Sequence, residues 1–364
     1  MSIMNGKRRK LLYLLTLTAL ALLLTGVGVW NFFGFSLPLP PPTRELSALA
    51  GSPGLDSSLS AVFEGAPLAL VRDVWSYDAQ ELLAAPPVVV ENLVYVAAGR
   101  TRASGRVLAL DLYTGRVVWT VQLDSIADHA PVVAGDLLYI GVRTGRLLAL
   151  DRRSGQERWS FQGQFGISGA PVVEDGVLYL GCEAVYALDA ASGAQRWRHH
   201  LAGRIVQPLA HADGVVAAIG ADHSLYLINA WNGKRRLSFP LWFNPSGELA
   251  ISGETVAITG DSANVQALNM YGRDIPIEKT VRFWWTRLWL YGSAPRPPLP
   301  PGYAWQVRAA AGGVGHLMAS DDRRFYLGVD DPRQTGRILA LDNATGEALW
   351  EVSFPSPVTS SATV

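Results

Sequence analysis

A short unit that is written six times along the chain constrains the fold more than any other feature. Its clearest copy is residues 108–119, Leu-Ala-Leu-Asp-Leu-Tyr-Thr-Gly-Arg-Val-Val-Trp. The two leucines that flank the alanine alternate as in a strand with one face of large residues. Asp111 can bond the backbone ahead of it and Gly115 can adopt a positive φ. We therefore expect a tight turn, followed by a second strand that contains Trp119.

The spacing of the copies predicts the architecture. Asp or Asn opens the turn at positions 111, 151, 189, 229, 269 and 342, so successive copies lie 40, 38, 40, 40 and 73 residues apart. A period near forty residues, with about four strands in each unit, is typical of a β-propeller. We predict an all-β fold, a seven- or eight-bladed β-propeller of four-stranded repeats over residues 67–364. The equivalent turn and packing positions are Asp111, Gly115, Trp119, Asp151, Gly155, Trp159, Asp189, Gly193, Trp197, Asp342, Gly346 and Trp350.

Both ends of the predicted propeller match parts of a unit. Residues 68–77, with Trp75, resemble a last strand, and residues 360–364 resemble a first strand. If the ring closes, these segments share one blade. A truncated reading frame is the alternative.

The N-terminal region has the pattern of a signal-anchor. Residues 7–10 are Lys-Arg-Arg-Lys, and the nineteen residues from Leu11 to Val29 carry no charge. A helix of that length, rising ~1.5 Å per residue, spans a ~30 Å hydrocarbon core. We predict a cytoplasmic tail at 1–10, a single transmembrane helix at 11–30 and a Pro-rich linker at 31–66. The basic flank places the propeller outside the cytoplasm, in the periplasm or at the cell surface. The alternative is a signal peptide cleaved after Ala50.

The 73-residue step contains about 33 residues more than one ordinary unit. They include an aromatic run and then a Pro-rich run, together residues 281–303. One interpretation is an eroded blade whose last strand holds Trp305. The other is an insertion whose aromatic side chains enter the membrane interface, with arginines at the headgroups. The candidate interface residues are Phe283, Trp284, Trp285 and Trp289.

Composition and motifs argue against several functions. Lys plus Arg is 31 and Asp plus Glu is 31, so no net charge attracts nucleic acid. The single cysteine, Cys182, lies in a strand pattern and is expected to be a buried thiol. The six His residues are scattered, and the acidic pairs at 321–322 and 330–331 lack the spacing of a calcium loop. We predict no metal site and no catalytic residue.

The Ala-Leu-Asp-x-x-Thr-Gly-x-x-x-Trp units resemble the PQQ-like repeats of quinoprotein alcohol-dehydrogenase-type propellers, and among these the BamB-like branch. The resemblance covers about residues 66–364. It implies a non-enzymatic propeller outside the inner membrane. PQQ dehydrogenases of this type use a disulfide between adjacent cysteines and a calcium ion held by carboxylate and amide ligands. One cysteine cannot form that disulfide.

These observations favour a membrane-anchored, extracytoplasmic propeller that binds a protein or an envelope ligand and needs no cofactor. Its rigid ring would present variable loops to a partner. One alternative is a PQQ-dependent oxidoreductase with PQQ and Ca²⁺ in the central channel. Another is an extracytoplasmic ligand sensor whose helix associates with a second membrane protein.

Overall fold

The structure is a computed structural model that describes residues 44–45, 74–83, 85–101, 104–309, 313–330 and 336–355. The predicted tail at 1–10, the predicted transmembrane helix at 11–30 and nearly all of the predicted linker at 31–66 lie outside these residues. Within the described ranges, no helix is long and apolar enough to cross a bilayer. The chain divides into a smaller compact unit that includes residues 271–303 and a larger one that includes residues 44–270 and 304–364.

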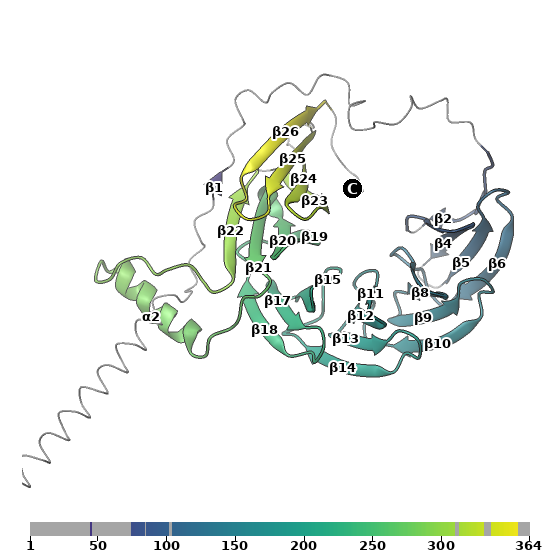
Figure 1. Cartoon of the computed structure of the whole chain (residues 1–364), viewed down its shortest axis with the longest axis horizontal. Coiled ribbons are helices and arrows are strands. Elements are labelled where there is room, and N and C mark those ends of the chain that lie inside the picture. The colour runs from purple at the N-terminus through teal and green to yellow at the C-terminus, as the bar shows by residue number, and fades with distance from the viewer. Residues whose placement is uncertain are drawn as a thin grey trace, which may run out of the picture. The chain divides into compact units, whose positions relative to one another are not determined.

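The larger unit consists of repeated antiparallel sheets, as predicted for a β-propeller. The described residues form six sheets, each built on four consecutive strands. Figure 1 shows these sheets side by side in chain order. The first three contain β2 (Leu82–Leu83), β3 (Val88–Val90), β4 (Leu93–Thr101), β5 (Ser104–Asp111) and β6 (Val117–Leu123); β7 (Val132–Ala134), β8 (Leu137–Gly141), β9 (Arg146–Asp151) and β10 (Glu157–Gln162); β11 (Val172–Glu174), β12 (Val177–Gly181), β13 (Ala184–Asp189) and β14 (Gln195–His200).

The other three sheets repeat this order, and the fifth gains one more strand. The short strand β1 (Arg44–Glu45) pairs with β22 in parallel orientation. The prediction of seven or eight blades stays a prediction, because both ends of the predicted ring fall partly outside the described residues. These sheets contain β15 (Ala210–Ala212), β16 (Val215–Ile219), β17 (Ser224–Asn229) and β18 (Arg235–Pro240); β19 (Pro245–Ser252), β20 (Thr255–Gly260), β21 (Asn264–Asn269) and β22 (Tyr303–Arg308); β23 (Val314–Ser320), β24 (Arg324–Asp330), β25 (Gly336–Asp342) and β26 (Ala348–Phe354).

The alanine of the repeated unit makes room for the tryptophan. In the first sheet Ala109 lies directly opposite Trp119, and in the second Ala149 lies opposite Trp159. Side chains directly opposite one another in an antiparallel pair are in contact, so a small residue accommodates the indole. A register shift next to this pair recurs between the third and fourth strands of several sheets. Such a bulge changes the direction in which the neighbouring side chain points.

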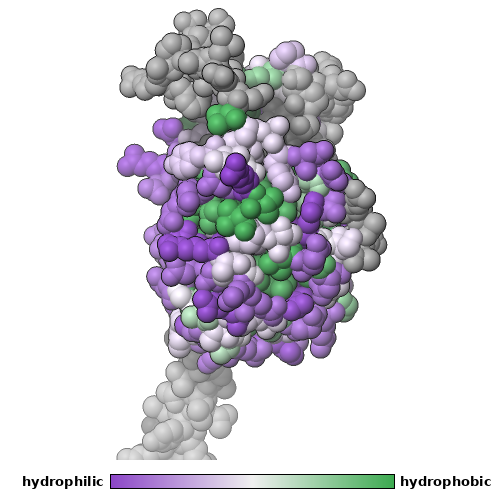
Figure 2. Space-filling model, turned by 90° about the vertical axis from the view of Figure 1, so that its right-hand side faces the viewer, coloured by the Kyte–Doolittle hydropathy of each residue, from purple (hydrophilic) through white to green (hydrophobic). Residues whose placement is uncertain are grey.

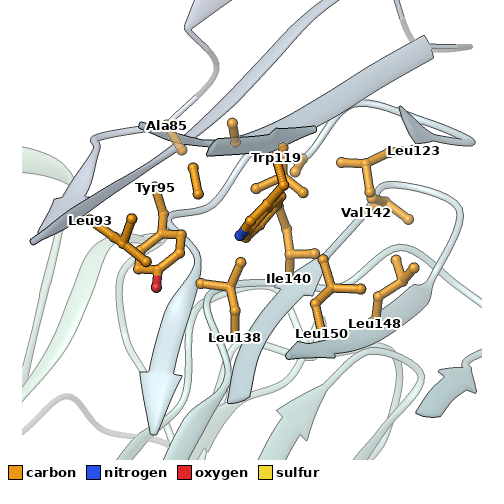
Figure 3. Packing of buried hydrophobic residues seen from close by; sticks show 14 residues of the cluster. Ala85, Leu93, Tyr95, Trp119, Leu123, Leu138, Ile140, Val142, Leu148 and Leu150 are labelled. Carbon is orange, nitrogen blue, oxygen red and sulfur yellow. The ribbon is translucent and has the colours of Figure 1, made fainter. Parts of the chain in front are cut away.

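The tryptophan of one sheet packs on the turn of the next sheet. Trp119 is 9% exposed, and its Nε1 donates a hydrogen bond to the Arg152 carbonyl oxygen at 3.0 Å. The indole covers Gly155, where a Cβ would lie 2.8 Å from the indole carbons, so only glycine fits there. Tyr95 lies 6.0 Å from the indole, centroid to centroid, and its hydroxyl donates to the same carbonyl. Figure 3 shows Trp119 and Tyr95 among aliphatic side chains of the first two sheets.

The same contact recurs along the chain, and the acceptor is always the residue that follows the Asp or Asn that opens the turn. Each indole Nε1 donates to that carbonyl oxygen at 2.7–3.0 Å. The additional pairs are Trp75 with Leu112, Trp159 with Ala190, Trp197 with Ala230 and Trp305 with Asn343. Trp75 makes the contact although residues 74–79 form no regular strand. One repeated aromatic contact therefore joins the described sheets to the sheets that follow them, except between the fourth and the fifth.

The extra residues of the 73-residue step lie between two strands of one sheet. Strand β21 ends at Asn269, and the next strand of that sheet, β22, begins at Tyr303 and contains Trp305. Between them lies the helix α2 (Glu278–Leu290). The helix occurs where the other sheets have their glycine turn. In the preceding sheet the tryptophan position holds Leu237, which is 2% exposed.

We expect Trp119→Ala to lower the free energy of unfolding by about 3–5 kcal/mol, because it leaves a cavity between two sheets. Trp119→Phe should cost less, since it retains most of the apolar contact and loses the Nε1 hydrogen bond, worth roughly 1 kcal/mol. Trp231→Ala is the control, because this side chain is 80% exposed. Chemical denaturation measures all three variants. Equal stability of Trp119→Ala and Trp231→Ala would contradict the proposed packing role.

Candidate functional site

The turn end of each sheet holds the repeat residues, and their polar atoms are used within the fold. Asp111 Oδ1 accepts hydrogen bonds from the Thr114 backbone and hydroxyl at 2.8 and 2.7 Å. These bonds lower the pKa of Asp111. Gly115 closes the turn with φ 68°. The turns that begin at Asp151, Asp189 and Asp342 repeat the arrangement, with Gly155, Gly193 and Gly346 in the same conformation.

Two of these aspartates have an additional partner. Arg158 Nη2 lies 2.7 Å from Asp151 Oδ2, and Arg196 Nη2 lies 2.8 Å from Asp189 Oδ2. The arginine bonds lower the pKa of both carboxyl groups, that of Asp189 to about 2. Since both carboxylate oxygens are engaged, these aspartates stabilise the turns and are poorly placed to bind a ligand.

The opposite end of the sheets carries residues that vary more from one sheet to the next. Because the strands of a sheet are antiparallel, the turns between second and third strands and the connections between sheets share this end. Arg143 N donates to the Ile126 carbonyl oxygen at 3.2 Å. Ala221 N donates likewise to Arg204 at 2.9 Å. We call this surface the connection face, formed by residues 124–130, 142–145, 163–169, 182–183, 201–209, 220–223, 241–244 and 261–263.

A largely buried carboxylate, Glu183, lies on the connection face between β12 and β13. It is 9% exposed. Its Oε1 accepts a hydrogen bond from the Tyr186 hydroxyl, and its Oε2 accepts one from the Gln164 backbone N–H at 3.0 Å. Burial acts to raise the pKa of Glu183, but hydrogen bonds from Tyr186 and Cys182 outweigh it and lower the pKa to about 2. Glu183 is therefore ionised at neutral pH.

The neighbours of Glu183 stay protonated at neutral pH. Burial, followed by the bond to Glu183, raises the pKa of Tyr186 to about 12 and that of Cys182 to about 12. Cys182 is 1% exposed, so it is the buried thiol that the sequence predicts and a poor nucleophile. Arg198 lies over the Tyr186 ring at 5.7 Å and also contacts His200. Both oxygens of Glu183 are engaged, so the cluster stabilises the connection face, and it lacks an activated nucleophile.

Other sheets also hold carboxylates on the connection face. In the second sheet Asp128 pairs with Arg143. In the fourth, the Tyr226 hydroxyl donates to Asp222 at 2.6 Å. Each carboxylate thus has its own donor and a fixed position. None of these residues was singled out from the sequence, although Glu183 and Asp222 lie 39 residues apart, close to the repeat length. The spacing from acid to tyrosine differs, three residues for Glu183 and four for Asp222.

The described residues contain no group of three or more His, Cys, Asp or Glu side chains that could hold a metal ion. His211 stacks on Tyr179, with ring centroids 4.8 Å apart, and its Nδ1 pairs with Glu174. His199 and His200 occupy successive positions of β14, where side chains point to opposite faces. These histidines pack or form local pairs.

The aromatic segment forms α2, and the four candidate interface residues divide between its two sides. Phe283 is 39% exposed and Trp284 is 58% exposed. Trp285 and Trp289 are half-buried, and Trp285 Nε1 donates to the Pro295 carbonyl oxygen at 2.8 Å. The sequence run alone could not separate these two pairs, because the division follows from the helical period.

A second exposed apolar surface lies on the first sheet. Figure 2 shows the side of the molecule that carries this sheet, where polar residues surround limited apolar areas. The outermost strand β6 contributes Val117 and Val118, which are 45% and 50% exposed. Strands β2 and β3 contribute Leu82, Leu83 and Val89. These exposed apolar residues lie on different strands of the first sheet and could contribute apolar contact area to a partner.

We expect Glu183→Gln to lower the stability of the fold at neutral pH and to make that stability less dependent on pH in the acidic range. The pKa of Glu183 is lowered from 4.5 to about 2, so its ionised form stabilises the fold above the ordinary pKa. That contribution is lost as the pH falls from about 4.5 towards about 2. Thermal denaturation over a pH series measures it, with Glu157→Gln on the surface as control. Identical pH profiles for parent and Glu183→Gln would contradict the assignment.

Solved structures place the fold among known propellers. BamB from Moraxella catarrhalis is 17% identical with a TM-score of 0.58, over 80% of this chain and 82% of that one. A computationally designed protein, Ika8, is 14% identical with a TM-score of 0.50, over 77% and 90%. A europium-containing methanol dehydrogenase is 13% identical with a TM-score of 0.52, over 79% and 74%. At these identities the likeness concerns the fold.

Sequence comparison gives the family. No curated protein sequence matches the chain. The sequence model described as outer membrane protein assembly factor BamB matches residues 25–166 and 143–275. The two matches together span more than half of the chain, and they cover the turns at Asp111, Asp151 and Asp189. The chain therefore belongs to this BamB-like family of PQQ-like β-propellers.

Proposed function

We propose that this protein is a non-catalytic propeller that binds a protein partner through its connection face. The observation that carries the proposal is the division between the two ends of the sheets. At the turn end, the repeated Asp, Gly and Trp residues make hydrogen bonds and packing contacts within and between sheets. At the connection face each sheet presents different side chains, as expected of a surface selected for binding.

The chemistry of the connection face suits a folded protein partner. Its carboxylates and arginines are fixed by hydrogen bonds, so binding would order few side chains. An exposed aromatic side chain, Phe165 at 53% exposure, projects from the connection between the second and third sheets. Aromatic residues with polar surroundings are common binding hot spots. The match to a family described as an assembly factor supports a role in holding other proteins.

We further propose that the propeller is held outside the cytoplasm by its N-terminal segment. The support is the uncharged run from Leu11 to Val29 after four basic residues. The chain would then act at the membrane, in the periplasm or at the cell surface.

A photo-crosslinking amino acid at Phe165 should capture the partner in cells, because Phe165 projects from the proposed binding surface. The matched control is the same substitution at Tyr113, which is 71% exposed and lies in a turn at the opposite end of the first sheet. Analysis of the crosslinked species by mass spectrometry gives the partner. Crosslinks of equal yield from both positions would contradict the assignment to the connection face.

We expect no oxidation of alcohols or sugars by the purified protein supplied with PQQ and Ca²⁺. The reason is that the buried Cys182 has no adjacent cysteine with which to form the disulfide that the PQQ dehydrogenases use. Dye reduction is the measurement. Quenching of tryptophan fluorescence by PQQ is a poorer criterion, because a chain with twelve Trp residues is easily quenched without specific binding. A lanthanide should replace Ca²⁺ in a parallel assay. Turnover that requires PQQ would overturn the non-catalytic proposal.

A further inference from the structure

Helix α2 has a polar interior side. Arg282 and Glu278 are 2% and 4% exposed, and Arg282 Nη2 lies 2.9 Å from Glu278 Oε1. Arg282 also donates to the carbonyl oxygens of Pro298 and Leu299 at 3.0 and 3.3 Å. Prolines have no backbone N–H, so a Pro-rich segment forms no regular ladder, and its carbonyl oxygens can accept such bonds. Thr286, at 5% exposure, extends this polar side along the helix.

The opposite side of α2 is apolar and exposed to solvent. Trp284 is 58% exposed, Leu288 is 46% exposed and Tyr291 is 81% exposed. Phe283 completes the surface and meets Trp284 edge-on, with centroids 5.6 Å apart. This distribution is the reverse of an ordinary surface helix, which turns its apolar stripe inward and its charges outward. We call this side of the helix, residues Phe283, Trp284, Leu288 and Tyr291, the aromatic face.

The segment that carries the aromatic face has predominantly positive exposed charges. Arg287 lies over the rings of Phe283 and Trp284, at 4.4 and 5.7 Å from their centroids. Between residues 271 and 303 the sequence has five basic and two acidic residues, and the acidic Glu278 is paired inside. The exposed basic residues of this segment are Arg273, Lys279, Arg287 and Arg296.

We propose that the aromatic face of α2 lies in the headgroup region of a bilayer that contains anionic lipid. Trp and Tyr favour this region because their rings are apolar and their N–H and O–H groups remain near water. Arg287 would reach the lipid phosphates while its stem stays on the rings. A cationic surface with exposed aromatic residues matches a negatively charged membrane in both charge and polarity.

The inference rests on the proposed location of the protein at a membrane, and it is independent of the propeller's protein partner. The contact would fix a second point of the chain at the bilayer, in addition to the proposed N-terminal anchor. Once the anchor holds the chain at the bilayer, binding of the aromatic face becomes intramolecular, so even a weak contact would be formed.

The test uses the full chain reconstituted into vesicles of equal parts phosphatidylcholine and phosphatidylglycerol. An environment-sensitive fluorophore is attached through Trp284→Cys, and in a matched control through Trp231→Cys, which is 80% exposed on the propeller. Cys182 is 1% exposed, which limits its labelling. We expect a blue shift and loss of quenching by aqueous iodide at position 284, and neither at position 231. The shift should diminish in vesicles of phosphatidylcholine alone.

Flotation of the same vesicles separates this inference from the proposed anchor. If the protein floats with the vesicles while iodide still quenches the fluorophore at position 284, the anchor proposal stands and the proposed role of α2 is overturned. A chain that does not float would contradict both. Protection at position 284 that depends on protein concentration and persists in detergent without lipid would identify a second copy as the occupant, and would overturn the lipid assignment.

Discussion

The fold depends on one contact, an indole ring laid on the glycine turn of the following sheet. A four-stranded sheet of this size cannot bury both of its faces alone, so each repeat requires its neighbours. The indole supplies a large apolar area, while its N–H and the nearby tyrosine hydroxyl satisfy a carbonyl group that would otherwise be buried without a partner. Packing and hydrogen bonding thus act at the same position, which fixes the angle and spacing between sheets.

Much of this could be predicted from sequence because the contact is periodic. The forty-residue spacing led to repeated four-stranded sheets, and the family match confirms the resemblance to PQQ-like repeats. The acceptor could not be predicted, since spacing does not say which sheet receives the ring of Trp119. The role of the alanine opposite the indole was also missed, although its recurrence at Ala109 and Ala149 was a usable signal.

The candidate sites were harder to predict for a physical reason. Glu183 and Asp222 lie 39 residues apart, which is close to the repeat length, but Arg143 occupies the corresponding position one repeat earlier. Because the residue type changes and the tyrosine partners lie at unequal spacings from the acids, this recurrence was missed. In the aromatic segment, composition alone fitted either strand or helix. In the helix, Trp284 is exposed and Trp285 is half-buried. This difference between neighbouring residues follows from the 3.6-residue period of the helix. The repeat therefore accounts for the scaffold and leaves the candidate sites undetermined.

One interruption has a consequence for how the ring holds together. Leu237 replaces tryptophan in the fourth sheet, and the sheet that follows has no glycine turn to receive an indole, because the chain leaves it for α2. The two changes compensate for each other, and together they leave this junction without the hydrogen-bonded aromatic contact found at its neighbours. Among the junctions between the described sheets, the one between the fourth and fifth would separate most easily under mechanical load, because it lacks the indole contact. The same junction would tolerate the splicing of another module more readily than any junction closed by an indole.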